Sequence, residues 1–184
     1  MKLARGFTLI ELIVVSSIAV IVITIAIDLF VSITRYQRKV LAEQEISNQM
    51  SYVIEYMSRA IRMAKKDTTG DCLGSGNEKN YLLTRNNKGI KFINHSDNDI
   101  CQEFFWDNDN GKIKEIKGSG AELSLNSDRV EITSLKFNLS GDDTTGDNLQ
   151  PRVTIFIEAQ TTGTLEQIKR QIQTTVSQRN LDVQ

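Results

Sequence analysis

The sequence has few of the residues that interrupt regular structure. Its 184 residues include a single proline, Pro151, and none of its 11 glycines lies between Gly6 and Gly70. Proline and glycine are the residues least compatible with a helix interior, so nothing between residue 7 and about residue 66 forces a helix to end. A helical pattern of that length indicates a coiled coil, a membrane span or a repeat. We therefore expect one long helix over this range.

Metal-binding side chains are also scarce, because the chain has two cysteines, Cys72 and Cys101, and one histidine, His95. A structural zinc site needs four such ligands, so zinc is not predicted. Two cysteines in an exported domain favour one disulfide, which would stabilise the fold by about 3–4 kcal/mol in the chain-entropy model. Two buried free thiols are the alternative, and the export signal described below favours the disulfide.

A large excess of positive charge is absent. The 22 basic residues face 23 acidic ones, and the formal net charge is -1. Nucleic-acid binding through bulk charge is therefore not expected. Three bases that do lie close together, Arg35, Arg38 and Lys39, are interpreted as a collar beside a membrane.

The N-terminal third holds a long apolar run. Residues 12–27 carry no charge, and extending the run back to Phe7 adds one acid, Glu11. About 20 apolar residues in a helix cross a membrane. A signal peptide would have a shorter apolar region followed by a small-residue cleavage site, and no convincing site follows here. An ordinary membrane anchor leaves Glu11 unexplained, since a carboxylate at depth costs roughly 2.5–3.5 kcal/mol.

The first 23 residues resemble the N-terminus of the type IV pilin superfamily, which includes type II secretion pseudopilins and competence pilins. The resemblance rests on a short basic leader, a glycine before the cut, an aromatic residue after it, one acid, and apolar flanks: Lys2, Arg5, Gly6, Phe7, Thr8-Leu9-Ile10, Glu11 and Leu12-Ile13-Val14-Val15. It implies that a membrane-embedded prepilin peptidase cuts the Gly6–Phe7 bond and methylates the new amine of Phe7. It also implies that Glu11 acts in assembly.

The physical chemistry of these residues agrees with the resemblance. Gly6 has no Cβ, so a protease can approach its backbone closely. Cleavage creates a positive amine on Phe7, and Glu11 lies one helical turn further on. Glu11 can pair with that amine in its own chain or in a neighbouring one. Either pair would offset the cost of burying the acid, and the intermolecular pair would also set the axial register between chains.

Beyond the apolar run, the predicted helix becomes amphipathic. Apolar residues recur at helical spacing on one face, namely Ile46, Met50, Val53, Ile54, Met57, Ile61 and Ala64. This spacing predicts a face that packs against the rest of the chain. Many members of the superfamily have a helix-breaking glycine or proline in the apolar half. This chain has neither, although Asp28 is a polar interruption, so we expect a straight or gently curved helix.

Residues 67–184 alternate strand signals with turn signals. We predict two hairpins, 81–84 with 90–93 and 101–106 with 112–116, the second around Asn110-Gly111, a strong hairpin turn. Further strands are expected near 122–125, 130–139, 153–159 and 167–176. An antiparallel sheet with one face on the amphipathic helix and one in water fits this alternation. The predicted fold class is α+β, the pilin fold.

Candidate chemistry in this part is weak. Asp107 and Asp109 are weak calcium candidates, because the spacing of their glycine does not fit an EF-hand. The sequence Asp-Thr-Thr-Gly-Asp occurs at 67–71 and again at 143–147, and two such loops can converge on a cation, although good turn residues explain it better. No catalytic constellation is found, so we expect neither an enzyme nor a cofactor.

The resulting organisation is a leader at 1–6, a transmembrane and polymerisation helix at 7–31, an amphipathic half at 32–66 and a β-rich head at 67–184. We expect a structural subunit, a minor pilin or J/W-type minor pseudopilin, because of its long last strands. Its partners would be prepilin peptidase, other pilins, the inner-membrane assembly platform and membrane lipid. It would span the bacterial inner membrane once, head outside, before entering a filament. The alternative is a membrane-tethered module that captures DNA or an exported substrate.

Overall fold

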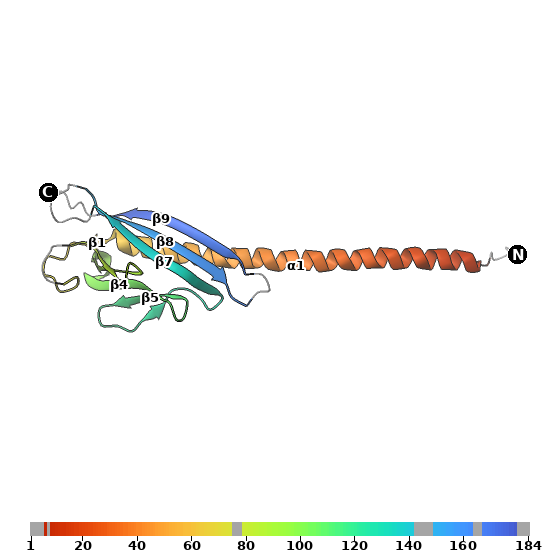
Figure 1. Cartoon of the computed structure of the whole chain (residues 1–184), viewed down its shortest axis with the longest axis horizontal. Helices are drawn as coiled ribbons and strands as arrows, with labels where there is room; N and C mark the ends of the chain where they lie inside the picture. The colour runs from red at the N-terminus through yellow and green to blue at the C-terminus, as the bar shows by residue number, and fades with distance from the viewer. Residues whose placement is uncertain (1–5, 7, 75–78, 142–148, 164–166, 180–184) are drawn as a thin grey trace. The chain divides into compact units, whose positions relative to one another are not determined.

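A computed structural model describes residues 6, 8–74, 79–141, 149–163 and 167–179 (Figure 1). The chain divides into two units, Met1–Leu41 and Ala42–Gln184. One helix, α1 (Leu9–Arg62), contributes to both units, as the missing glycines and prolines predict. The domain boundaries expected at residues 31 and 66 remain predictions.

The first unit consists of the N-terminal part of α1. Its apolar side chains are exposed, and a stretch of this helix is long and apolar enough to cross a membrane. The hydroxyls of Ser17, Thr24 and Thr34 donate to backbone carbonyls four residues earlier, at 2.8, 2.9 and 2.9 Å. These polar groups are therefore satisfied within the helix, which a lipid environment requires.

The second unit begins with the C-terminal part of α1. One face of it is buried, through Ile46, Met50, Val53, Met57, Ala60 and Ile61, which confirms the predicted amphipathic pattern. The helix ends at Arg62, four residues before the expected end. No glycine or proline ends it; instead Ala64–Lys65 form β1, which pairs with β3, and the His95 N–H donates to the Met63 carbonyl at 3.0 Å. Pairing with the sheet overrides local helix propensity here.

The strands form two antiparallel sheets, where the sequence suggested one. The first contains β1, β2 (Leu82–Thr84), β3 (Gly89–Asn94), β4 (Ile100–Asp107), β5 (Lys112–Lys117) and β6 (Leu123–Ser124), in the order β1-β3-β4-β5-β6 with β2 paired to β3. The second contains β7 (Val130–Ser140), β8 (Arg152–Thr161) and β9 (Lys169–Ser177). Both predicted hairpins are present, and the short 3₁₀-helix η1 (His95–Asp97) joins β3 to β4.

The two sheets meet through single backbone contacts rather than through a ladder. The Ile132 N–H of β7 donates to the Gly111 carbonyl at 2.9 Å, and the Phe137 N–H donates to the Asn87 carbonyl at 2.9 Å. Gly111 and Asn87 lie in the two hairpin turns of the first sheet. Because turns of the first sheet occupy this edge of β7, the two sheets meet there without a continuous ladder.

One hydrophobic core lies inside the second unit. The buried face of α1 shares it with Phe92 and Phe104 from the first sheet and with Leu135 and Phe137 from the second. The alternation predicted for β8 is confirmed, since Val153, Ile155, Ile157 and Ala159 are all buried.

Candidate functional site

The N-terminus of α1 is capped by reciprocal hydrogen bonds between Thr8 and Glu11. The Glu11 N–H donates to Thr8 Oγ1 at 3.3 Å, and the Thr8 N–H donates to Glu11 Oε2 at 3.3 Å. The Thr8 hydroxyl also donates to Glu11 Oε2 at 3.2 Å. This is a capping box, in which a threonine and a glutamate three residues later satisfy donors that a helix N-terminus leaves unpaired. Our interpretation of the sequence missed it, although Thr-x-x-Glu is its signature.

The capping box gives Glu11 a role before any cleavage occurs. Its carboxylate accepts hydrogen bonds from Thr8 at the first turn, so it is not an unsatisfied acid. Gly6 is exposed, and no atom lies within 4 Å of where a Cβ would stand. The backbone of Gly6 is therefore not covered by other described parts of the chain. Phe7 and the leader residues 1–5 lie outside the described residues.

The head contains the predicted disulfide. Cys72 and Cys101 are joined, with their Cα atoms 5.5 Å apart, and the bond ties a loop that precedes the first hairpin to β4. In the described residues no free cysteine remains. Two of the predicted site residues, 29 positions apart in sequence, are thus brought together.

A buried carboxylate, Asp67, shapes the loop that carries Cys72. Its Oδ1 accepts from the Gly70 N–H at 2.8 Å, and its Oδ2 accepts from the N–H groups of Cys72 and Leu73 at 3.0 and 2.7 Å. Burial by itself raises the pKa of Asp67, but the N–H donors favour the charged form and hold the pKa below its ordinary value. The first Asp-Thr-Thr-Gly-Asp repeat therefore serves as a turn around its own aspartate. The second, at 143–147, lies outside the described residues.

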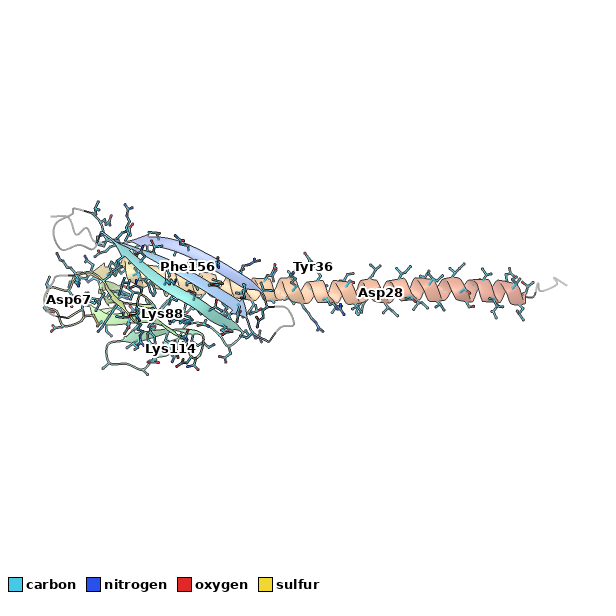
Figure 2. All side chains as sticks on the ribbon, in the orientation of Figure 1. Asp28, Tyr36, Asp67, Lys88, Lys114 and Phe156 are labelled. Atoms are coloured by element: carbon cyan, nitrogen blue, oxygen red, sulfur yellow. A yellow bond between two sulfur atoms is a disulfide. The ribbon has the colours of Figure 1, made fainter. Side chains whose placement is uncertain are left out.

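The weak calcium candidates lie at the turn between β4 and β5. Asp107 Oδ2 accepts from Asn110 Nδ2 at 2.7 Å and forms an ion pair with Lys114 Nζ at 2.6 Å. Lys114 is labelled in Figure 2. The hydrogen bond from Asn110, followed by that from Lys114, lowers the pKa of Asp107 to about 2. A lysine thus already neutralises this carboxylate. Among the described residues, no group of three or more His, Cys, Asp or Glu side chains is placed to hold a metal ion.

A buried polar network joins α1 to the first sheet. Glu115 is only 3% exposed and accepts from the Tyr56 hydroxyl at 2.8 Å and from Gln102 Nε2. Gln102 in turn accepts from Asn94 Nδ2 at 2.7 Å. Burial, and then the neighbouring Glu115, raise the pKa of Tyr56. The period of two in β5 could have predicted that Glu115 is buried, because it lies two residues after Ile113 on the same face of the strand. Its partners could not have been predicted in this way.

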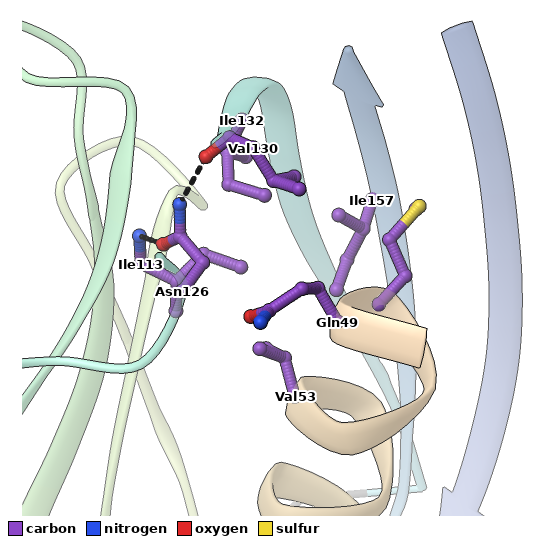
Figure 3. A pocket seen from close by; sticks show the side chains of 8 residues that line it. Gln49, Val53, Ile113, Asn126, Val130, Ile132 and Ile157 are labelled. Carbon is purple, nitrogen blue, oxygen red and sulfur yellow. Dashed lines mark hydrogen bonds between the residues drawn. The ribbon is translucent and has the colours of Figure 1, made fainter. Parts of the chain in front are cut away.

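Figure 3 shows a narrow gap between α1 and the strands, which has no enclosed space for a water-sized molecule. Asn126 lies on its wall, where its amide donates to the Val130 carbonyl at 2.7 Å and accepts from the Ile113 N–H at 2.8 Å. Ligand pockets usually enclose about 300–1,000 Å³. The gap is smaller and mostly apolar, so we interpret it as a packing defect and not as a binding site.

The N-terminal geometry agrees with a comparison to known families. Residues 1–27 match the family model described as the prokaryotic N-terminal methylation motif. The chain carries a prepilin-type N-terminus. No curated protein and no solved structure matches the chain. The motif supports processing by prepilin peptidase, and the long helix followed by antiparallel sheets is a pilin-like α+β fold. Because nothing matches beyond residue 27, the head is interpreted from its own structure alone.

Proposed function

We propose that this chain is a minor subunit of a type IV pilus-like filament or a type II secretion pseudopilus. In this proposal the subunit is cut after Gly6, methylated on Phe7, and assembled through α1. The observation that carries it is the methylation motif over residues 1–27, and the exposed apolar helix that has Glu11 in its first turn supports it. An exposed apolar helix of this length needs lipid or other helices around it.

Glu11 would change partners as the subunit matures. In the uncut chain its carboxylate caps the helix with Thr8. Cleavage adds a positive charge on Phe7, and a charged amine is a stronger hydrogen-bond donor to a carboxylate than a neutral N–H group. In lipid, this pair compensates a charge that would otherwise be costly. When Glu11 pairs instead with the Phe7 amine of a neighbouring copy, that ion pair would favour movement of the subunit from the membrane into the filament. It would also fix the axial register between the two copies.

The head would be the outward-facing part of the subunit. Its disulfide, the Asp67 loop and the Glu115 network rigidify it without creating an active site among the described residues. A structural role accounts for these features. The long strands β7–β9 favour a minor subunit, of the kind that initiates or caps a filament, and inner-membrane assembly machinery would be its partner.

The direct test is the N-terminus of the protein itself. The full chain is produced in a bacterial host with prepilin peptidase and its filament machinery, and its N-terminal peptide is examined by mass spectrometry. We expect a chain that begins at N-methylated Phe7, and a leader that is retained when Gly6 is replaced by Leu, since a side chain at Gly6 blocks close approach of the peptidase. A retained leader on a monomeric wild-type chain would contradict the proposal and favour the membrane-tethered binding module.

A further inference from the structure

The apolar part of α1 contains a second acid, Asp28, which lies just beyond the methylation motif that ends at residue 27. Asp28 stands between Ile27 and Leu29, and all three side chains are exposed (Figure 2). In the described part of the chain, its carboxylate makes no hydrogen bond or ion pair. A carboxylate among lipid-facing residues is costly unless it finds a partner. Asp28 therefore needs an explanation that the motif does not supply.

No base lies within one helical turn of Asp28. The residues three and four positions away, which are the ones that can touch it on a helix, are Thr24, Ile25, Val31 and Ser32. The first base on the same face is Arg35, two turns further along. Seven residues correspond to about 10.5 Å of axial rise. Asp28 and Arg35 consequently do not form an ion pair within one chain, and Arg35 is also exposed.

We propose that Asp28 pairs with Arg35 of a neighbouring copy when helices pack side by side, an inference that rests on the proposed filament function. A copy displaced by seven residues toward its own N-terminus brings its Arg35 level with Asp28 of the first copy. Each interior copy then uses Asp28 toward one neighbour and Arg35 toward another. This head-to-tail contact is heterologous and can propagate along a filament.

The Glu11 pair demands a displacement in the same direction. If the amine on Phe7 of the first copy meets Glu11 of the neighbour, that neighbour is also displaced toward its N-terminus, by four residues. The two displacements differ by three residues, about 4.5 Å of rise. The long arginine side chain can span much of that difference. A single stagger therefore satisfies both charge pairs, whereas a pair with a base N-terminal to Asp28 would require the opposite direction.

The distribution of basic residues supports the pair independently. Membrane proteins concentrate lysine and arginine on the cytoplasmic side. In the proposed orientation, Arg35, Arg38 and Lys39 lie at the opposite end of the apolar run from the leader. The collar inferred from the sequence therefore lies on the side that this charge bias does not favour, and Arg35 needs a further reason to lie there. A carboxylate on each neighbouring copy does give one for Arg35.

The test exchanges the two charges in the full chain, produced with prepilin peptidase and its assembly machinery. We expect Asp28→Arg to be cut normally after Gly6 but to enter filaments at least roughly tenfold less, because it places like charges together. Adding Arg35→Asp in the same chain should restore incorporation. Adding Arg38→Asp instead is the matched control, and it should not restore incorporation, because a pair between residues 28 and 38 needs a displacement of ten residues, about 9 Å of rise more than the Glu11 pair.

A cross-linking experiment keeps the proposal testable if the charge variants are unstable. Residues 28 and 35 of one helix are too far apart for a disulfide, which needs Cα atoms within about 7 Å. A disulfide in Asp28→Cys, Arg35→Cys would therefore join two copies, and we expect a ladder of oligomers that the Asp28→Cys, Arg38→Cys control lacks.

Two results separate the possible failures. Normal assembly of Asp28→Arg, or rescue by Arg38→Asp and not by Arg35→Asp, would overturn the pair while leaving the filament proposal intact. A wild-type chain that is cut but never assembles would overturn both.

Discussion

At the scale of single residues, Glu11 has two roles that a substitution can separate. It caps α1 through Thr8, and it supplies a negative charge one turn from the proposed cleavage point. Glutamine serves the capping box as well as glutamate does, but it carries no charge. Glu11→Gln therefore keeps the first function and removes the second.

We expect Glu11→Gln and Glu11→Ala to be cut after Gly6 and to lose filament incorporation to a similar extent, by roughly tenfold or more, because both lack the charge that pairs with the amine. The measurement is the ratio of filament-bound to membrane-bound subunit. If Glu11→Gln assembles like the wild type while Glu11→Ala does not, capping is the important role and the charge-pair account is wrong.

At the scale of elements, the loop before the first hairpin depends on one buried charge. Asp67 is 2% exposed and receives hydrogen bonds from the N–H groups of Gly70, Cys72 and Leu73. The turn formed by residues 67–71 around the Asp67 carboxylate thus places Cys72 beside β4, where Cys101 lies. The turn character of this segment was evident in its sequence, but the burial of Asp67 was not, because burial depends on strands that come later in the chain.

We expect Asp67→Asn to lower the free energy of unfolding by about 1.5–3 kcal/mol at neutral pH, the usual contribution of hydrogen bonds to a charged group. Because the folded pKa of Asp67 is depressed, this stabilisation is present above the unfolded pKa of about 4 and is lost as the pH falls toward the folded value. Urea unfolding of the detergent-solubilised chain at pH 7 and pH 3 measures both. Asp71→Asn, an exposed change in the same loop, is the control, and a difference between Asp67→Asn and wild type that stays constant with pH would contradict this account.

At the scale of the whole molecule, the second unit is one core in which α1 is joined to the first sheet by a polar network. Tyr56 and Glu115 are 59 residues apart, and their hydrogen bond of 2.8 Å lies beside Phe104, whose ring meets that of Tyr56 edge-on. A buried carboxylate loses its hydration on folding, and hydrogen bonds compensate that free-energy cost. The loss of one donor leaves part of the cost uncompensated. The network is therefore costly to break from either side.

We expect Tyr56→Phe to destabilise the fold by about 1–3 kcal/mol, since it leaves Glu115 short of one donor in a buried site. The adjacent Tyr52 stacks on Tyr56 but is 59% exposed, so Tyr52→Phe should stay within about 0.5 kcal/mol of the wild type. Thermal unfolding followed by near-ultraviolet circular dichroism compares the two variants. Equal effects from both substitutions would show that the hydroxyl of Tyr56 contributes nothing specific.

The sequence by itself determined the features that depend on neighbours along the chain. The missing glycines and prolines and the apolar run specified α1, the motif over residues 1–27 specified the prepilin-type start, and the Asn110-Gly111 turn specified the hairpin of β4 and β5. The helix and the hairpin turn follow from local backbone preferences, and the motif is a contiguous stretch of sequence. None of the three depends on contacts between residues far apart in the chain.

Only the tertiary structure decided the features that depend on residues far apart. The end of α1 at Arg62 follows from the pairing of Ala64 with Asn94, and the division into two sheets follows from hairpin turns that occupy one edge of β7. The partners of Glu115 come from α1 and β4. Pairing and burial energies of this kind arise only when the chain is folded, and they outweigh local propensities of a few tenths of a kcal/mol per residue.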